Sequence, residues 1–180
     1  IDELEKICKS ADFSTEYYQE KSKEIDACYD EIIREMPKNM NEKEAVQYFL
    51  NWIKDNVEYD YSVYESSIEP YYDKLYENEV YADVSNKGCI LDKRGICGGI
   101  SIILSELCNR VGITAYPVFG TIKSDGTLIP HGWVAMRVDD STYYIDPTYV
   151  CQTGEMDNLK MKNEMERIGD RQYQLEDSFE

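Results

Sequence analysis

The chain has 180 residues, which fits one domain of ordinary size, and 42% of them are hydrophobic, which is enough for a core and argues against general disorder. Its formal net charge of −17 repels phosphate groups, so the composition argues against a nucleic-acid partner and against binding to anionic membranes. The sequence has no run of about 18 apolar residues, so no membrane-spanning segment is expected.

The N-terminal third is predicted to form two core-packing helices. Ser14 or Thr15 can cap a first helix that runs to about Met36, where Pro37 ends it. Residues 41–44 resemble a capping box, with Asn in place of the usual Ser or Thr, and predict a second helix that ends near residue 56. The apolar faces are Ile25, Tyr29 (or Cys28), Ile32, Ile33 and Met36 in the first helix, and Val46, Phe49, Leu50 and Ile53 in the second.

Residues 57–96 are dense in tyrosine and are predicted to be mostly loop, with a short helix from about Pro70 to Tyr76. Such a long connection either shapes a substrate site or simply covers the core. A third helix is predicted over residues 98–111, with apolar residues on one face and Gly112 at its C-terminal end.

Three strands are predicted after this helix, at about residues 114–122, 129–138 and 142–150, with turns at 124–126 and 139–140. Helices followed by antiparallel strands indicate an α+β fold. If Val138 pairs with Ser141, apolar residues oppose one another on one face of the second hairpin. His131 and Asp146 then lie on its other face as diagonal neighbours about 7–8 Å apart.

Cys97 lies where a glycine-containing turn enters the third helix. The positive end of a helix and a nearby imidazolium both lower the pKa of a thiol, and the backbone N–H of Cys97 could stabilise an oxyanion. A thiol, an imidazole and a carboxylate in this order are the parts of a cysteine acyl-transfer site. Each residue alone is more often structural, but the combination with Gly95, Gly98 and Gly99 favours catalysis.

These motifs resemble those of the transglutaminase-like superfamily, a papain-like group that includes small bacterial members. The resemblance covers about residues 42–150. The matching segments are 57–61, 95–99, 110–113, 131–133 and 144–148.

The resemblance implies a helical lobe that carries the nucleophile and packs on an antiparallel sheet. It also implies a triad of Cys97 as nucleophile, His131 as base and acid, and Asp146 as the group that orients the imidazole. A side chain upstream of the cysteine completes the oxyanion hole in many members, and the aligned candidates here are Tyr59 and Trp52. Neither a calcium-binding loop nor the zinc cysteine pairs of the peptide:N-glycanase branch are present, so no metal and no cofactor are expected.

The predicted function is cysteine-dependent acyl transfer on peptide or glutamine-type amide bonds of a protein or peptide substrate, with hydrolysis favoured over crosslinking. One alternative is a non-catalytic binding module on the same fold, which the 16 tyrosines favour because tyrosine is enriched at binding surfaces. Another is a regulatory disulfide between Cys97 and Cys89 or Cys151. The six cysteines and a first residue other than Met favour an extracellular or cell-envelope location over the cytoplasm.

We expect a single domain over residues 1–180. It would have a core at 42–150, a helical extension at 1–40 and a tail at 152–180. Within that tail, apolar residues between 156 and 168 suggest a further helix.

Overall fold

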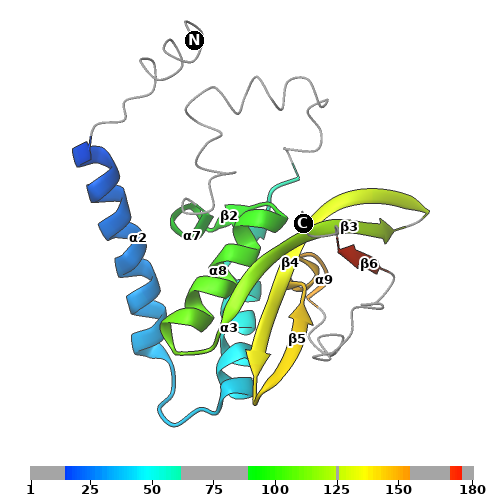
Figure 1. The fold of residues 1–180 in the computed structure, drawn as a ribbon. Helices are drawn as coiled ribbons and strands as arrows, with labels where there is room; N and C mark the ends of the chain where they lie inside the picture. The colour runs from blue at the N-terminus through cyan, green and yellow to red at the C-terminus, as the bar shows by residue number, and fades with distance from the viewer. Residues whose placement is uncertain (1–14, 62–88, 125, 155–170, 176–180) are drawn as a thin grey trace, which may run out of the picture.

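A four-stranded antiparallel sheet packs against a group of helices in the computed structural model of the chain, which describes residues 15–61, 89–124, 126–154 and 171–175 (Figure 1). The long helices are α2 (Thr15–Glu35), α3 (Glu42–Asn56) and α8 (Cys97–Arg110). The sheet has the order β5-β4-β3-β6 and contains β3 (Ala115–Ser124), β4 (Thr127–Val138), β5 (Ser141–Ile145) and β6 (Gln172–Leu175). This arrangement confirms the predicted α+β fold with a helical N-terminal lobe.

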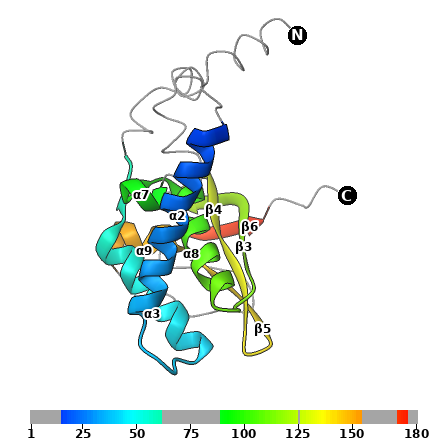
Figure 2. The ribbon, with the colours of Figure 1, turned by 90° about the vertical axis from the view of Figure 1, so that its left-hand side faces the viewer.

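Helix α8 lies at the centre of the molecule. It contacts β3 and β4 on one side and α2 and α3 on the other, and Figure 2 shows α2 in front of it when viewed from the helical side. Its residues Ile100, Ile103, Leu104 and Leu107 are fully buried. Cys97, the N-terminal residue of α8, is therefore positioned by a helix that packs between the sheet and the other helices.

The two N-terminal helices follow their predicted boundaries closely. The capping box at the start of α3 is complete: the Asn41 side chain accepts from the Glu44 N–H at 3.0 Å, and the Glu44 carboxylate accepts from the Asn41 N–H at 2.9 Å. Ile25, Tyr29 and Ile32 of α2 are buried in the same core as α3 and α8. Helix α2 is thus part of the core rather than an appendage to it.

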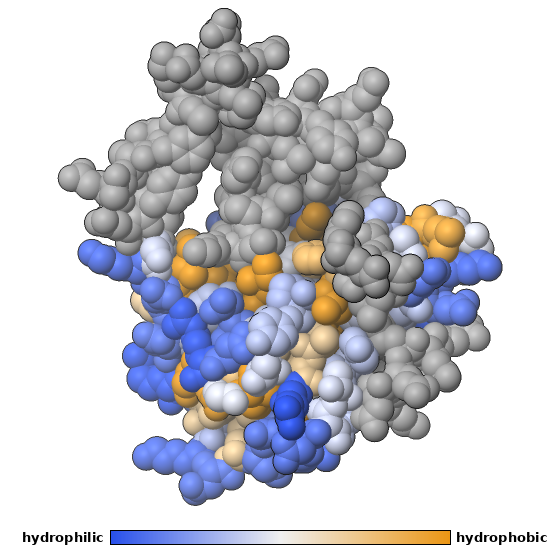
Figure 3. Space-filling model, viewed as in Figure 1, coloured by the Kyte–Doolittle hydropathy of each residue, from blue (hydrophilic) through white to orange (hydrophobic). Residues whose placement is uncertain are grey.

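Charged residues keep to the outer face of these helices, as expected of amphipathic helices. In Figure 3, hydrophilic side chains cover α2 and the turns at the lower end of the molecule. At the end of α8, Arg110 bonds to Asp26 and Asp30 of α2 and lies over the ring of Tyr29, with 4.8 Å between the guanidinium carbon and the ring centre. These contacts tie α2 to α8 along the rim of the core.

The hairpin of β4 and β5 has the predicted register. Val138 pairs with Ser141 and Val134 pairs with Ile145. Asp139 and Asp140 form the turn with φ of 49° and 62°, the left-handed conformation that two-residue hairpin turns of this type require. The predicted pairing of apolar residues is also confirmed, because Val134, Met136 and Ile145 are all buried.

The prediction of the third strand, at about residues 142–150, was wrong over the second half of that range. Strand β5 ends at Ile145, and residues 147–150, which were expected to continue it, belong to helix α9 (Pro147–Thr153). Asp146 is the N-cap of α9, and Pro147 occupies the first turn, where its missing N–H has no cost. The dipeptide that ends the strand therefore also starts a helix.

The segment expected to be mostly loop contains short elements on either side of a stretch outside the described residues. Strands β1 (Glu58–Tyr59) and β2 (Arg94–Gly95) pair in parallel, and α7 (Cys89–Asp92) precedes β2. The helix predicted from Pro70 to Tyr76 and the one suggested between 156 and 168 lie outside the described residues. Residues 172–175, expected to belong to a tail, form β6 and pair with β3.

Candidate active site

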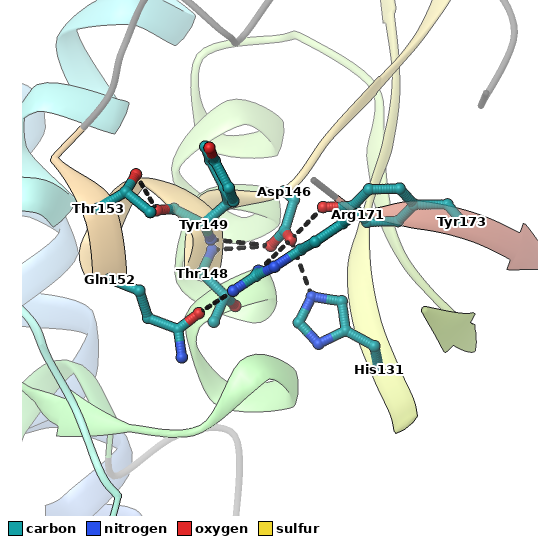
Figure 4. A network of polar contacts seen from close by, with 8 residues as sticks. All are labelled: His131, Asp146, Thr148, Tyr149, Gln152, Thr153, Arg171 and Tyr173. Carbon is teal, nitrogen blue, oxygen red and sulfur yellow. Dashed lines mark hydrogen bonds and ion pairs between the residues drawn. The ribbon is translucent and has the colours of Figure 1, made fainter. Parts of the chain in front are cut away.

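His131 and Asp146 are in direct contact, as the hairpin register predicted. The Nε2–H of His131 donates to Oδ2 of Asp146 at 2.9 Å, and both side chains are buried (Figure 4). His131 comes from β4 and Asp146 from the junction between β5 and α9. The imidazole also stacks on Trp133, with 6.2 Å between the ring centres. The imidazole ring is therefore fixed by the hydrogen bond to Asp146 at one edge and by the Trp133 ring over one face.

The carboxylate of Asp146 accepts hydrogen bonds on both oxygens. Oδ1 accepts from the N–H groups of Thr148 and Tyr149, at 3.0 and 3.2 Å. Oδ2 accepts from His131, from Arg171 Nη1 at 3.0 Å and from the Tyr173 hydroxyl at 2.5 Å. Burial alone would raise the pKa of Asp146, but the charge and hydrogen bond of His131, the Tyr173 hydroxyl and the Arg171 charge outweigh it. The pKa is lowered on balance, and the carboxylate is ionised.

Cys97 is the first residue of α8 and is 9% exposed. The imidazole of His131 and the backbone N–H of Gly132 both act on this thiol and lower its pKa. Since Nε2 of His131 is bonded to Asp146, Nδ1 is the nitrogen left for the thiol. The N-cap residue, Ile96, has an apolar side chain that forms no capping hydrogen bond, so it does not occupy the first N–H groups of the helix.

Electrostatics favour a thiolate beside an imidazolium. Burial alone would raise the pKa of Cys97, but the hydrogen bond and charge of His131, with the Gly132 N–H, lower it on balance. Burial alone would lower the pKa of His131, but Asp146 and Cys97 raise it to about 9. Both shifts favour the state in which the proton resides on the imidazole rather than on the sulfur.

Two other cysteines behave in the opposite way. Burial raises the pKa of both Cys108 and Cys151 to about 12, so each remains a protonated thiol. Cys97 and Cys151 are both free thiols, so the disulfide considered between them is not formed in this structure. Reactivity toward an electrophile should consequently differ sharply among these three cysteines.

A family model described as the transglutaminase-like domain matches residues 27–163. The chain belongs to the transglutaminase-like domain family. No curated protein matches it significantly.

Two solved structures resemble this transglutaminase-like domain. One is a crystal structure of a protein described as a TGase, with a TM-score of 0.52 and 17% identity over 82% of this chain. The other is a candidate cysteine protease from Cytophaga hutchinsonii, with a TM-score of 0.45 and 19% identity over 71% of this chain. The matches cover 37% of each of those chains, so this chain spans little more than a third of their length.

The strand pair β1–β2 lies next to the nucleophile of this transglutaminase-like domain. Its register places Tyr59 opposite Gly95, two residues before Cys97, while Trp52 lies on α3 and packs against the main core. The Arg94 guanidinium bonds to the buried Asp60 at 2.8 Å and links the two strands of the pair. Which of Tyr59 and Trp52 serves as a side-chain oxyanion donor stays a prediction.

An exposed aromatic ring lies beside the site. Phe119 of β3 pairs with Gly132 of β4 and is 54% exposed. A Cβ atom at Gly132 would lie 3.0 Å from the edge of the Phe119 ring and 3.7 Å from the Cα of Gly98. The ring thus packs directly over the backbone whose N–H lowers the pKa of the Cys97 thiol. Glycine at position 132 is what allows this close approach.

Sequence reasoning did not single out Arg171, Tyr173 or Gln152 at this site. Arg171 and Tyr173 lie 25 and 27 positions from Asp146 along the chain, and no local motif links them to it. The alternation of polar and apolar residues in Gln-Tyr-Gln-Leu at 172–175 was the available signal for a strand.

Within residues 15–61, 89–124, 126–154 and 171–175, no three His, Cys, Asp or Glu side chains cluster in a way that could hold a metal ion. In the same residues, no helix combines the length and the apolar character needed to cross a membrane.

Proposed function

We propose that this domain is a cysteine-dependent acyl-transfer enzyme that acts on peptide or glutamine-type amide bonds, with Cys97, His131 and Asp146 as its triad. The observation that carries the proposal is that one buried imidazole, His131, is hydrogen-bonded to Asp146 at 2.9 Å and lowers the pKa of the Cys97 thiol. The lowered pKa of Cys97 and the raised pKa of His131 support the roles of nucleophile and acid.

The proposed reaction begins when the Cys97 thiolate attacks the carbonyl carbon of the amide. The negative charge that develops on the carbonyl oxygen would be stabilised by the N–H groups at the start of α8 and by a side-chain donor, for which Tyr59 and Trp52 are candidates. The His131 imidazolium then protonates the leaving amine, the C–N bond breaks, and a thioester remains on Cys97. Neutral His131 next removes a proton from the acceptor that attacks the thioester. The C–S bond then breaks, the acyl product leaves, and the Cys97 thiolate and the His131 imidazolium are restored.

We favour water over an amine as this acceptor. Transfer to an amine requires that the site hold the amine and keep water away, because water is present at far higher concentration. The sequence offers no cue for an amine site. Hydrolysis of the thioester needs no further binding element beyond the base, His131.

A binding module on the same fold is the second candidate. The observation that favours it is the group of exposed aromatic side chains Tyr61, Tyr116 and Phe119, since aromatic residues are enriched at interfaces. Such a module would have no use for an activated thiol. The state of Cys97 therefore discriminates between the two candidates.

Brief treatment of the folded, reduced protein with dilute iodoacetamide near pH 7, followed by intact mass measurement and peptide mapping, tests the proposal. We expect selective labelling of Cys97, with Cys108 and Cys151 as internal references, and loss of this selectivity in His131→Ala. Peptide cleavage, ammonia release from glutamine peptides and amine incorporation would then be assayed in parallel, with Cys97→Ala as the inactive control. Uniformly slow labelling of all cysteines would favour the binding module.

A further inference from the structure

Asp146 is held from its far side by two residues of a distant segment. Arg171 Nη1 donates to Oδ2 at 3.0 Å, and the Tyr173 hydroxyl donates to the same oxygen at 2.5 Å (Figure 4). The Arg171 guanidinium also bonds to the Gln152 side chain and lies over the Tyr149 ring, 5.0 Å from its centre. With a side-chain exposure of 13%, Arg171 is fixed in place by α9 and by Asp146 together.

Tyr173 lies on β6 and Arg171 directly precedes it, and this strand is aligned with His131 through β3. Gly120 of β3 pairs with His131 on one side and with Leu175 of β6 on the other. Tyr173 packs against Trp133, with 5.3 Å between ring centres, and lies 6.2 Å from the imidazole. The docking of β6 therefore sets the position of both donors relative to the imidazole.

Four charged groups alternate in sign through this site. The Cys97 thiolate, the His131 imidazolium, the Asp146 carboxylate and the Arg171 guanidinium form a row whose charges sum to zero. Without Arg171, a buried net negative charge would remain, which is costly in a medium of low dielectric constant.

The other titratable groups that face Asp146 do not change this sum. Tyr173 of β6 has a raised pKa because of burial and the nearby carboxylate, so it remains a neutral donor. Cys151 of α9 has a pKa of about 12 because of burial and the charge of Asp146, and it remains a thiol. Tyr149 of α9 contributes its backbone N–H to the carboxylate.

We propose that Arg171 and Tyr173 are positioning residues of this site, which hold the Asp146 carboxylate against His131 and set the pH range over which the thiolate–imidazolium pair exists. The proposal rests on the function proposed above. Three donors on Oδ2 and two on Oδ1 prevent rotation of the carboxylate. Arg171 additionally supplies the cation that compensates Asp146 on the side away from the imidazole.

The direction of the pH effect follows from charge. A nearby cation lowers the pKa of every group around it, because it disfavours the protonated form. Removing the Arg171 charge should therefore raise two pKa values: that of Cys97, at which the ion pair forms, and that of His131, at which it is lost. Both limbs of the pH profile should move to higher pH by about one unit.

The test is the rate of iodoacetamide labelling of Cys97 as a function of pH, which needs no substrate. The lower limb is the inflection where the thiolate forms, and the upper limb is the inflection where His131 loses its proton and the reactivity of the thiolate changes. In Arg171→Met both limbs should move up together, and Arg171→Lys should move them most of the way back. Tyr173→Phe removes a neutral donor that fixes the carboxylate, so Asp146 bonds His131 less firmly and the upper limb alone should fall. Gln172→Ala, an exposed position of the same strand, is the matched control and should leave the profile unchanged.

Superimposable profiles for wild type and Arg171→Met, with labelling still dependent on His131, would overturn the inference and leave the proposed function standing. Equal shifts in Gln172→Ala would also overturn it, because they would show a general effect of disturbing β6. If Arg171→Met fails to fold, an unchanged upper limb in Tyr173→Phe overturns the inference. Slow labelling of wild-type Cys97 would overturn both proposals at once.

Discussion

Asp146 bonds to His131 through one carboxylate oxygen and caps helix α9 through the other. Oδ2 lies 2.9 Å from the imidazole Nε2, while Oδ1 accepts the N–H groups of Thr148 and Tyr149. The same side chain therefore orients the candidate base and starts the helix that follows it. Stability and activity should respond differently to substitutions that preserve one of these two bonding patterns.

Asp146→Asn and Asp146→Ala separate the two roles. The amide oxygen of Asn can still cap α9, whereas Ala removes the cap at a cost of about 1 kcal/mol before any further loss from the unpaired Arg171. Both variants lack the negative charge that stabilises the imidazolium, so kcat should fall on the order of 10³-fold or more in each. Chemical denaturation and initial rates measure the two effects. Near-wild-type kcat in Asp146→Asn would contradict the orienting role.

The pH dependence of stability should reveal where the shared proton lies. The folded pKa of His131, raised to about 9 from 6.5, adds stability that is present below pH 6.5 and is lost as the pH rises through 9. Cys97 acts in the opposite sense, because its lowered folded pKa adds stability that is present above its unfolded pKa and is lost as the pH falls. Wherever the folded pair is a thiolate beside an imidazolium and the unfolded pair is a thiol beside a neutral imidazole, each pair holds one proton, so the two contributions cancel.

Cys97→Ala removes this cancellation. Cys97 supplies part of the raised pKa of His131, so this pKa falls below 9 in the variant. The free energy of unfolding of the variant, relative to wild type, should therefore fall by about 1 kcal/mol as the pH rises from about 7 to 8.5. Urea unfolding at closely spaced pH values measures the difference, and Cys28→Ala on α2 is the control thiol. A constant difference between Cys97→Ala and wild type across this range would mean that Cys97 is protonated in the folded protein.

Phe119 should contribute to substrate binding. Its ring is 54% exposed and lies over Gly132, beside the nucleophile, so it can contact the substrate near the scissile amide. We expect Phe119→Ala to raise KM about 10-fold with little change in stability. Tyr116→Ala, a 63% exposed aromatic of the same strand that pairs with Ala135, is the matched control. Equal effects of the two substitutions on KM would show that Phe119 is not part of the substrate-binding site.

The capping box of α3 should affect stability alone. Asn41→Ala removes the hydrogen bond to the Glu44 N–H and should lower the free energy of unfolding by about 1 kcal/mol, without changing the labelling rate of Cys97. Asn51→Ala, at an exposed position within the same helix, removes no cap and should leave stability almost unchanged. Thermal unfolding of the two variants side by side measures the contrast.

Local patterns in the sequence were sufficient for the helices and for the hairpin that carries His131. Helical periodicity and a capping box placed α3, and the opposition of apolar residues placed Val138 against Ser141. These signals were reliable because each depends on residues within a few positions of one another, where backbone geometry dictates which side chains meet. The Asp-Pro junction was misread in the same region, because a strand terminator and a helix start use the same two residues.

The sequence by itself determined the order of thiol, imidazole and carboxylate, the helix that begins at Cys97 and the register that brings His131 to Asp146. Only the tertiary structure decided what surrounds Asp146: it brings Arg171 and Tyr173 across 25 and 27 positions to the oxygen that already binds His131. It also placed Phe119 over Gly132. These contacts depend on how β6 docks on β3 and how β3 lies against β4, and such long-range pairing has no periodicity by which a single sequence could disclose it.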